Sequence, residues 1–110
     1  MANKYLRKYV TPAATTETTI YTVPDANTSV ISSLRITNRN ASVALLDVYV
    51  YPTGGATAYR LLKSYTLPSS STMDAVSGVP LILEATDVLK IKSSVADVDF
   101  YLSYLEMDRN

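Results

Sequence analysis

The chain has 110 residues, and its ten basic and ten acidic side chains give a formal net charge of zero. It contains no cysteine and no histidine, which excludes disulfides, thiolate catalysis, Ser–His triads and imidazole metal ligands. Zero net charge also disfavours a general nucleic-acid binder, which needs a basic excess. The length indicates one domain, and a hydrophobic content of 47% is enough for a packed core.

Membrane insertion and secretion are not expected from the sequence. No apolar run approaches the roughly 18–20 residues that cross a bilayer. The first ten residues contain three basic side chains but lack the apolar region of a signal peptide. We therefore expect no membrane partner and synthesis in a cytoplasm.

The first half of the chain contains strand-like runs that end at turn residues. Residues 1–16 are expected to form an N-terminal arm or edge strand, in which Lys4–Val10 alternates along the chain. A single domain over residues 17–110 then begins with strands at Glu17–Val23, Ser29–Asn38 and Val43–Tyr51, which are rich in residues that favour a pleated sheet. Proline and asparagine between these runs predict turns.

The second half continues in the same way. Strands are expected at Tyr59–Leu67, Met73–Val76, Val88–Ser93 and Val98–Met107, and the apolar run Leu81–Leu83 leads into a turn at Glu84–Asp87. The only helical candidate is a single turn near Leu81–Asp87. Short strands at regular spacing predict an all-β fold, a single antiparallel β-sandwich of the jelly-roll or immunoglobulin-like type with about eight strands.

Alternation within the strands predicts which side chains are buried. Leu46 and Val48 share one face of their strand, and Phe100 and Leu102 share one face of the last strand. Val30, Leu34 and Ile36 are expected to share one face of their strand, with Ile31 on the other. The opposite faces should carry Leu45, Tyr49, Tyr51, Leu105 and Met107 outward.

Two groups of residues are candidates for partner contacts. The N-terminal run combines basic and aromatic side chains, namely Lys4, Tyr5, Arg7, Lys8 and Tyr9. These side chains could contact nucleic acid, dock on an acidic neighbouring subunit or form only a solvated first strand. At zero net charge we favour a protein–protein arm that adds strand pairing or salt bridges to the adjacent subunit. The second group is the outward set Leu45, Tyr49, Tyr51, Leu105 and Met107, since the chain has nine tyrosines and exposed tyrosine is favoured at interfaces. Burial of this set predicts a homo-oligomer with closed symmetry, such as a trimer.

Carboxylates offer the remaining candidate chemistry. Asp97 and Asp99 lie about 6.5–7 Å apart along one strand face, and with Asp87 or Glu84 they could hold Ca²⁺. No EF-hand-like spacing supports calcium, so a solvated strand face is the favoured interpretation. No acid pair stands out as a glycosidase site, and Ser69–Ser71 has no base to activate it. We therefore expect no enzyme activity, no cofactor and no metal.

Two segments resemble a known family. Ile20–Asn38 (IYTVPDANTSVISSLRITN) resembles a phrase of small tailed-phage virion proteins, in which Tyr-Thr-Val-Pro and a polar loop precede an Ile/Ser/Asn strand. Tyr65–Pro68 followed by Gly78–Ile91 resembles the second half of those proteins, with Thr86 in place of their usual glycine. These motifs are turn and core signatures without an active site.

The resemblance implies a bacteriophage virion structural protein, made in the host cytoplasm and located in the virion. Size, neutrality, tyrosine content and the N-terminal arm favour a capsid decoration (cement) protein. A tail, neck or baseplate accessory protein is the alternative, followed by a module that binds host carbohydrate. The expected partners are other virion proteins, namely the major capsid protein or tail proteins.

Overall fold

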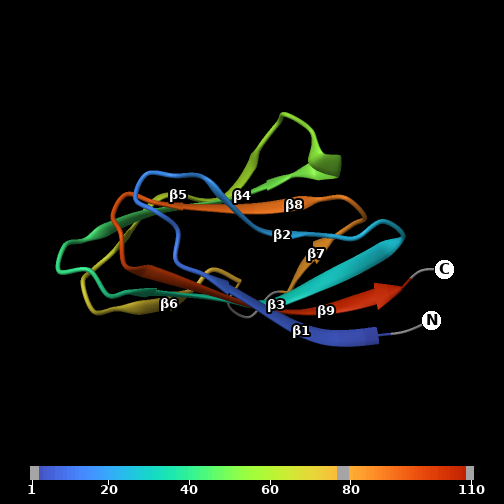
Figure 1. Ribbon diagram of the computed structural model, residues 1–110, viewed down its shortest axis with the longest axis horizontal. Coiled ribbons are helices and arrows are strands. Elements are labelled where there is room, and N and C mark those ends of the chain that lie inside the picture. Colours follow the sequence, from blue (N-terminus) through green and yellow to red (C-terminus); the bar gives the residue numbers. More distant parts are fainter. Residues whose placement is uncertain (1–2, 77–79, 109–110) are drawn as a thin grey trace.

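The computed structural model describes residues 3–76 and 80–108 and consists mostly of β-strands. Two antiparallel sheets pack face to face (Figure 1), which confirms the predicted β-sandwich. The described residues form nine strands, where about eight were expected. Sheet A contains β1 (Asn3–Val10), β9 (Val98–Asp108), β3 (Asn27–Asn38), β6 (Thr72–Asp74) and β7 (Leu81–Leu83). Sheet B contains β2 (Thr18–Thr22), β8 (Val88–Ser93), β4 (Ala44–Tyr51) and β5 (Tyr59–Leu67).

The strand order is that of a jelly roll. Sheet A has the order β1-β9-β3-β6, with β7 also on β3, and sheet B has the order β2-β8-β4-β5. The first strand therefore pairs with the last, β2 pairs with β8, β3 with β6 and β7, and β4 with β5. This is the pairing of one long hairpin rolled into two layers, with β6 and β7 as two halves of an interrupted strand. The strand order therefore identifies the sandwich as a jelly roll and not as the immunoglobulin-like type, a choice that the sequence left open.

The helical turn expected near Leu81–Asp87 is wrong, because Leu81–Leu83 pairs with β3 as β7. The one helical segment in the described part of the chain is the 3-10 turn η1 (Pro52–Gly54), which begins at a proline. It lies in the loop that projects above β4 in Figure 1. Within residues 3–76 and 80–108, no helix is long and apolar enough to span a membrane. Gly78 and Val79, part of the second resemblance motif, lie outside the described residues.

The core lies between the two sheets and confirms most of the predicted facing. Leu46, Val48, Phe100 and Leu102 are all fully buried. Because β4 and β9 run through the middle of their sheets, alternate residues of each reach the same interior. The other fully buried large side chains come from every layer, namely Val23, Ile31, Leu34, Ile36, Leu83, Leu89, Ile91 and Val98.

The predicted facing of β3 is wrong for the first half of the strand. Val30 is only half-buried, and Ile31 is buried with Leu34 and Ile36. The pairing of β3 with β9 shifts between Ile31 and Ser33, so Ser32 is an extra residue in the strand. Such a bulge reverses the alternation on one side of it. Val30 therefore lies on the outer face of sheet A.

Asn38 closes the end of β3 as a fully buried polar side chain. Its Nδ2 donates to the carbonyl oxygens of Ser42 and Leu67, each at 3.0 Å. Its Oδ1 accepts the backbone N–H of Asn40 at 2.9 Å. All three bonds tie β3 of sheet A to the connection into β4 and to the end of β5, so this one side chain joins the two sheets at that end.

Candidate interaction surfaces

A network of charged and aromatic side chains covers part of the outer face of sheet B. Tyr49 donates from its hydroxyl to Glu17 Oε2 at 2.8 Å, and Lys90 Nζ lies 3.2 Å from Glu17 Oε1. The Arg60 guanidinium lies 4.8 Å from the centre of the Tyr49 ring, and Lys90 lies 4.8 Å from that of Tyr51. Burial raises the pKa of Glu17, but the hydrogen bonds from Tyr49 and Lys90 outweigh it and the pKa ends below its usual value.

This network corrects one expectation about the tyrosines. Tyr49 and Tyr51 do lie on the face opposite the core, but Tyr49 is only 3% exposed and Tyr51 is half-buried. Burial, with the neighbouring Glu17, raises the pKa of Tyr49 well above its usual value. Tyr49 is therefore not the exposed aromatic that the sequence predicts, because Arg60 and Glu17 cover it. Leu45, on the same face, is exposed as expected.

Sheet A carries a row of apolar side chains across its outer face. Tyr5 lies opposite Leu105, Leu105 lies opposite Val30, and Val30 lies opposite Ile82 in the strand register. Residues directly opposite each other share a face, so these four side chains form one continuous stripe over β1, β9, β3 and β7. Tyr5 is 86% exposed and Ile82 56%. We call this set (Tyr5, Leu105, Val30, Ile82) the outer stripe; Met107 lies next to it on β9.

A second aromatic pair lies on the same face. The rings of Tyr9 and Tyr101 are 6.1 Å apart and tilted, and the Arg7 guanidinium lies 6.0 Å from the Tyr9 ring centre. Beside Tyr101 runs a shallow trough of about 430 Å³ lined by Ser33, Arg35, Thr37, Asp99, Tyr101 and Ser103. The outer face of sheet A thus presents a continuous apolar stripe, an exposed aromatic pair and an open trough. Sheet B also exposes large hydrophobic side chains, namely Leu45, Tyr59, Leu61 and Tyr65.

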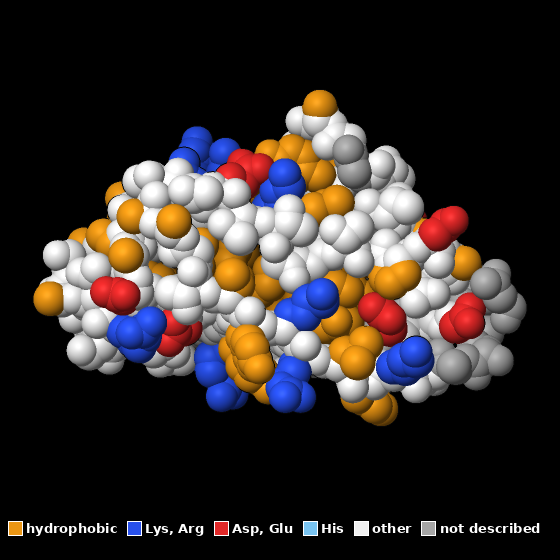
Figure 2. All heavy atoms as spheres, in the orientation of Figure 1, with side chains coloured by type: hydrophobic (Ala, Val, Ile, Leu, Met, Phe, Trp, Pro, Cys, Tyr) orange, Lys and Arg blue, Asp and Glu red, His pale blue; other side chains and the backbone are white. Residues whose placement is uncertain are grey.

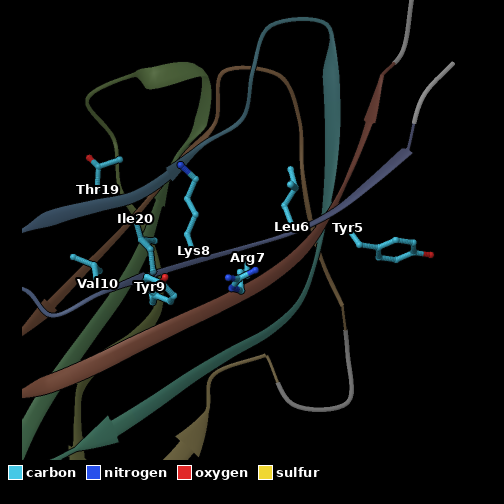
Figure 3. Close-up of a pocket in the computed structure, with 8 residues that line it drawn as sticks. All are labelled: Tyr5, Leu6, Arg7, Lys8, Tyr9, Val10, Thr19 and Ile20. Atoms are coloured by element: carbon cyan, nitrogen blue, oxygen red, sulfur yellow. The ribbon is translucent and has the colours of Figure 1, made fainter.

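A groove separates the edge strands of the two sheets. It has a volume of about 750 Å³ and is lined by Tyr5–Val10 of β1 with Thr19 and Ile20 of β2. Figure 3 shows Leu6 and Lys8 extending from β1 toward β2, with Arg7 on the other side of the strand. Figure 2 shows Lys and Arg side chains along the lower edge, where β1 runs, and hydrophobic side chains between the layers above them. β1 itself is exposed along nearly its whole length.

A buried polar cluster is centred on Tyr21, the residue that follows Ile20 of the groove lining. The Tyr21 hydroxyl donates to Glu106 Oε2 at 2.7 Å and accepts from the buried Ser29 Oγ at 2.6 Å. The Tyr21 and Tyr104 ring centres are 4.2 Å apart, and Lys8 Nζ lies 5.9 Å from the Tyr21 ring. Burial raises the pKa of Tyr21 far above its usual value, and the Glu106 carboxylate raises it further. The cluster therefore holds β2 against β3 and β9.

Two of the carboxylates named from the sequence, Asp99 and Asp87, act as structural acceptors, as does Asp74. Asp99 accepts from Arg39 Nε at 2.7 Å and from Thr11 Oγ1 at 2.7 Å, and the hydrogen bond from Arg39 lowers the pKa of Asp99. Asp87 accepts the N–H groups of Thr53 and Glu84. Burial raises the pKa of Asp74, but the N–H groups of Val76 and Leu34 outweigh it and leave that pKa lowered. Among the described residues no three acidic side chains come together in a metal-holding group.

The structure brings the N-terminal candidates together with residues that sequence reasoning missed. Lys4, Tyr5, Arg7, Lys8 and Tyr9 all lie on β1, and Leu105 and Met107 lie beside them on β9. Leu45 lies apart from them on sheet B. The missed members of these surfaces are Ile20, Val30, Ile82 and Tyr101. Only the alternation of β9 could have indicated Tyr101, because the other three depend on the bulges in β2 and β3 and on the pairing of β7.

Comparisons with known proteins find likenesses of fold. No protein-family model matches the chain, and no curated protein matches it in sequence. Among solved structures, a subunit of the disulfide-linked pili formed by Bacillus endospore appendages has a TM-score of 0.57 at 12% identity, over 99% of this chain and 88% of that one. The infectious bursal disease virus particle structure has a TM-score of 0.56 at 11% identity over 94% of this chain, and the VP2 subviral particle of that virus has 0.55 at 12% over 94%.

The chain spans about a third of the length of the two viral proteins it matches, 30% and 32%, respectively. A pentameric capsid protein from metagenomic phage sequences is more similar in sequence, at 22% identity over 91% of this chain and 59% of that one, but its TM-score is only 0.46. At these identities the likeness establishes the fold alone. The fold of this chain is thus similar to that of solved pilus and virus-particle structures.

Proposed function

We propose that the chain is a structural protein of a virus particle, and specifically a capsid decoration protein that stabilises the head through protein–protein contacts. The observation that carries the proposal is the exposed apolar and aromatic surface of sheet A, where the outer stripe continues across four strands and lies on the same face as Tyr9 and Tyr101. Apolar stripes of this kind mark contact sites.

Two further findings support this role. The pilus and viral chains that share the fold are, by their descriptions, subunits of a pilus and of a virus particle. The motifs Ile20–Asn38 and Tyr65–Pro68 resemble those of small tailed-phage virion proteins. The acidic side chains described above accept hydrogen bonds from neighbouring backbone and side-chain groups, so the proposal assigns no catalytic chemistry to them.

Self-association belongs to the same proposal. The outer stripe and the Tyr9–Tyr101 pair occupy one flat sheet face, and covering such a face with a second protein surface removes apolar area from water. Closed symmetry is the usual result for one kind of subunit, and a trimer suits capsid junctions. The major capsid protein is the proposed partner of the assembled form.

The test is the location and copy number of this protein in purified, intact particles. Quantitative mass spectrometry against the major capsid protein, combined with antibody labelling in the electron microscope, measures both. A decoration protein should be present in hundreds of copies on the head. The matched variants Tyr5→Ala with Ile82→Ala, in the outer stripe, should lower that copy number, whereas Lys63→Ala on the opposite sheet should not.

The outcome also separates the alternatives. A few to a few dozen copies at the tail would replace decoration by a tail, neck or baseplate role. A tip location would favour host carbohydrate binding, for which the trough beside Tyr101 offers an aromatic ring among hydroxyl, guanidinium and carboxylate groups. Absence from particles would contradict a virion role altogether.

A further inference from the structure

β1 is the least protected sheet edge in the described part of the molecule. β2 has five residues and a register shift beside Ile20, β6 and β7 have three residues each, and β5 has two irregularities and a positive φ at Ser64. Short edges and bulges discourage the pairing of a further strand. β1 has eight residues, no register shift and no proline. It is therefore the edge on which a further strand can be added.

The strand register identifies the free backbone groups of this edge. The N–H and C=O of Leu34 bond to Asp74 and Ala75, so they point away from β9. Leu102, opposite Leu34, must then direct its own groups to Lys8 of β1. Even-numbered residues of β1 are thus bonded to β9, and the N–H and C=O groups of Tyr5, Arg7 and Tyr9 point to the open side.

The charge of this edge selects the partner. β1 carries Lys4, Arg7 and Lys8, and no acidic residue precedes Glu17 in the sequence. Lys4 lies opposite Glu106, but none of the three cations belongs to an ion pair between described residues. Pairing two copies of β1 would bring six cations together, which disfavours self-pairing. An acidic partner strand would instead place carboxylates beside the three cations of β1.

The two faces of β1 carry different side chains, and these predict a residue pattern in the partner strand. Leu6 and Lys8 face the groove and Ile20, whereas Arg7 faces outward between Tyr5 and Tyr9. A strand beside β1 places directly opposite residues on the same face. Its matching residues are therefore an acid opposite Lys8, an acid opposite Arg7 and an apolar side chain opposite Leu6, in consecutive positions.

We propose that β1 binds an extended acidic segment of a neighbouring virion protein as an added antiparallel strand, with its backbone on Tyr5, Arg7 and Tyr9 and its apolar side chain in the groove against Ile20. The inference deepens the proposed function by naming the contact edge and the chemistry of the partner. Its test uses the isolated protein, so it fails or succeeds independently of whether the protein is found in particles.

The experiment titrates the full chain with a capped peptide about as long as β1. The peptide has two consecutive glutamates followed by valine, flanked by threonines. Amide hydrogen exchange followed by NMR should show slower exchange at Tyr5, Arg7 and Tyr9 when the peptide is bound. Even-numbered amides of β1 are already bonded to β9, so the alternating pattern is specific to strand addition.

Matched variants separate backbone pairing from charge. Arg7→Pro removes an N–H that β9 does not use, and it should weaken peptide binding at least about tenfold beyond Arg7→Ala, which removes the charge alone. Lys8→Glu should reverse the preference toward a peptide with lysines in place of the glutamates. Lys63→Glu, on the edge strand of sheet B, should change the affinity less than about twofold. Retained protection of the even-numbered amides of β1 establishes that each variant is folded.

Five results would each overturn the proposal. The acidic peptide fails to bind at millimolar concentration, or it binds without slowing exchange at Tyr5, Arg7 and Tyr9. The lysine peptide binds the native protein equally well. The free protein is already a dimer with these three amides protected, which is self-pairing through β1. A single-stranded oligonucleotide protects them as well as the acidic peptide does, which makes the edge a nucleic-acid contact.

Discussion

Replacing Phe100 with alanine is expected to lower the free energy of unfolding by about 3–5 kcal/mol. Phe100 is fully buried in the central strand pair of sheet A, opposite Val10 on one side and Ile36 on the other. Neighbours on both sides are held by the ladder and cannot collapse into the space, so the loss includes a cavity as well as the buried area. Denaturant unfolding followed by far-UV circular dichroism measures the change.

The adjacent residue supplies the control for this prediction. Tyr101 faces the opposite side of β9, is 40% exposed and packs on Tyr9. Tyr101→Ala should cost only about 1 kcal/mol, the loss of one exposed aromatic pair. Equal effects of the two substitutions would mean that the facing of β9 is wrong.

The second large effect is expected from Asn38→Asp, which changes one buried amide into a carboxylate of nearly the same shape. The aspartate keeps the acceptor for Asn40 but cannot donate to the carbonyl oxygens of Ser42 and Leu67. These two acceptors would lose their partner and face a negative charge, so we expect a loss of about 2–4 kcal/mol at neutral pH. Thermal unfolding of the variant and the native protein gives this difference.

The pH dependence of this variant tests the cause. At low pH the protonated acid can again donate one hydrogen bond, so the gap between the variant and the native protein should narrow as pH falls. Asn40→Asp makes the same chemical change two positions later at a half-buried residue, whose Nδ2 donates one hydrogen bond, to the carbonyl oxygen of Ala96 at 3.1 Å. It should cost less than Asn38→Asp, about 1 kcal/mol. A gap that widens at low pH would contradict the role given to Asn38.

Much of the fold could be predicted because most strands are regular. Leu46 and Val48 in β4 and Phe100 and Leu102 in β9 alternate without interruption, so the period of two places them in the core directly. The jelly-roll order could not be predicted, because it depends on pairings such as β1 with β9 that join opposite ends of the sequence.

The wrong predictions about buried and exposed side chains each depend on one local feature of the structure. One extra residue, Ser32, reverses the facing of Val30 and Ile31, and nothing in the alternation of that segment marks the bulge. Tyr49 is buried because Glu17, 32 residues away, and Arg60 on β5 cover it. The basic and aromatic composition of residues 4–9 was visible in the sequence, but the free backbone groups of Tyr5, Arg7 and Tyr9 follow only from the register of three strands.

Amide hydrogen exchange in assembled particles tests the central claim, that this jelly roll contacts its virion neighbour through the edge of β1. Exchange is measured on the free protein and on the same protein in purified particles, with peptide fragments resolved to single amides. The account predicts that Tyr5, Arg7 and Tyr9 exchange at least about tenfold more slowly in the particle, while exposed β5 amides such as that of Lys63 do not change. Equal exchange at Tyr5, Arg7 and Tyr9 in both forms would contradict it.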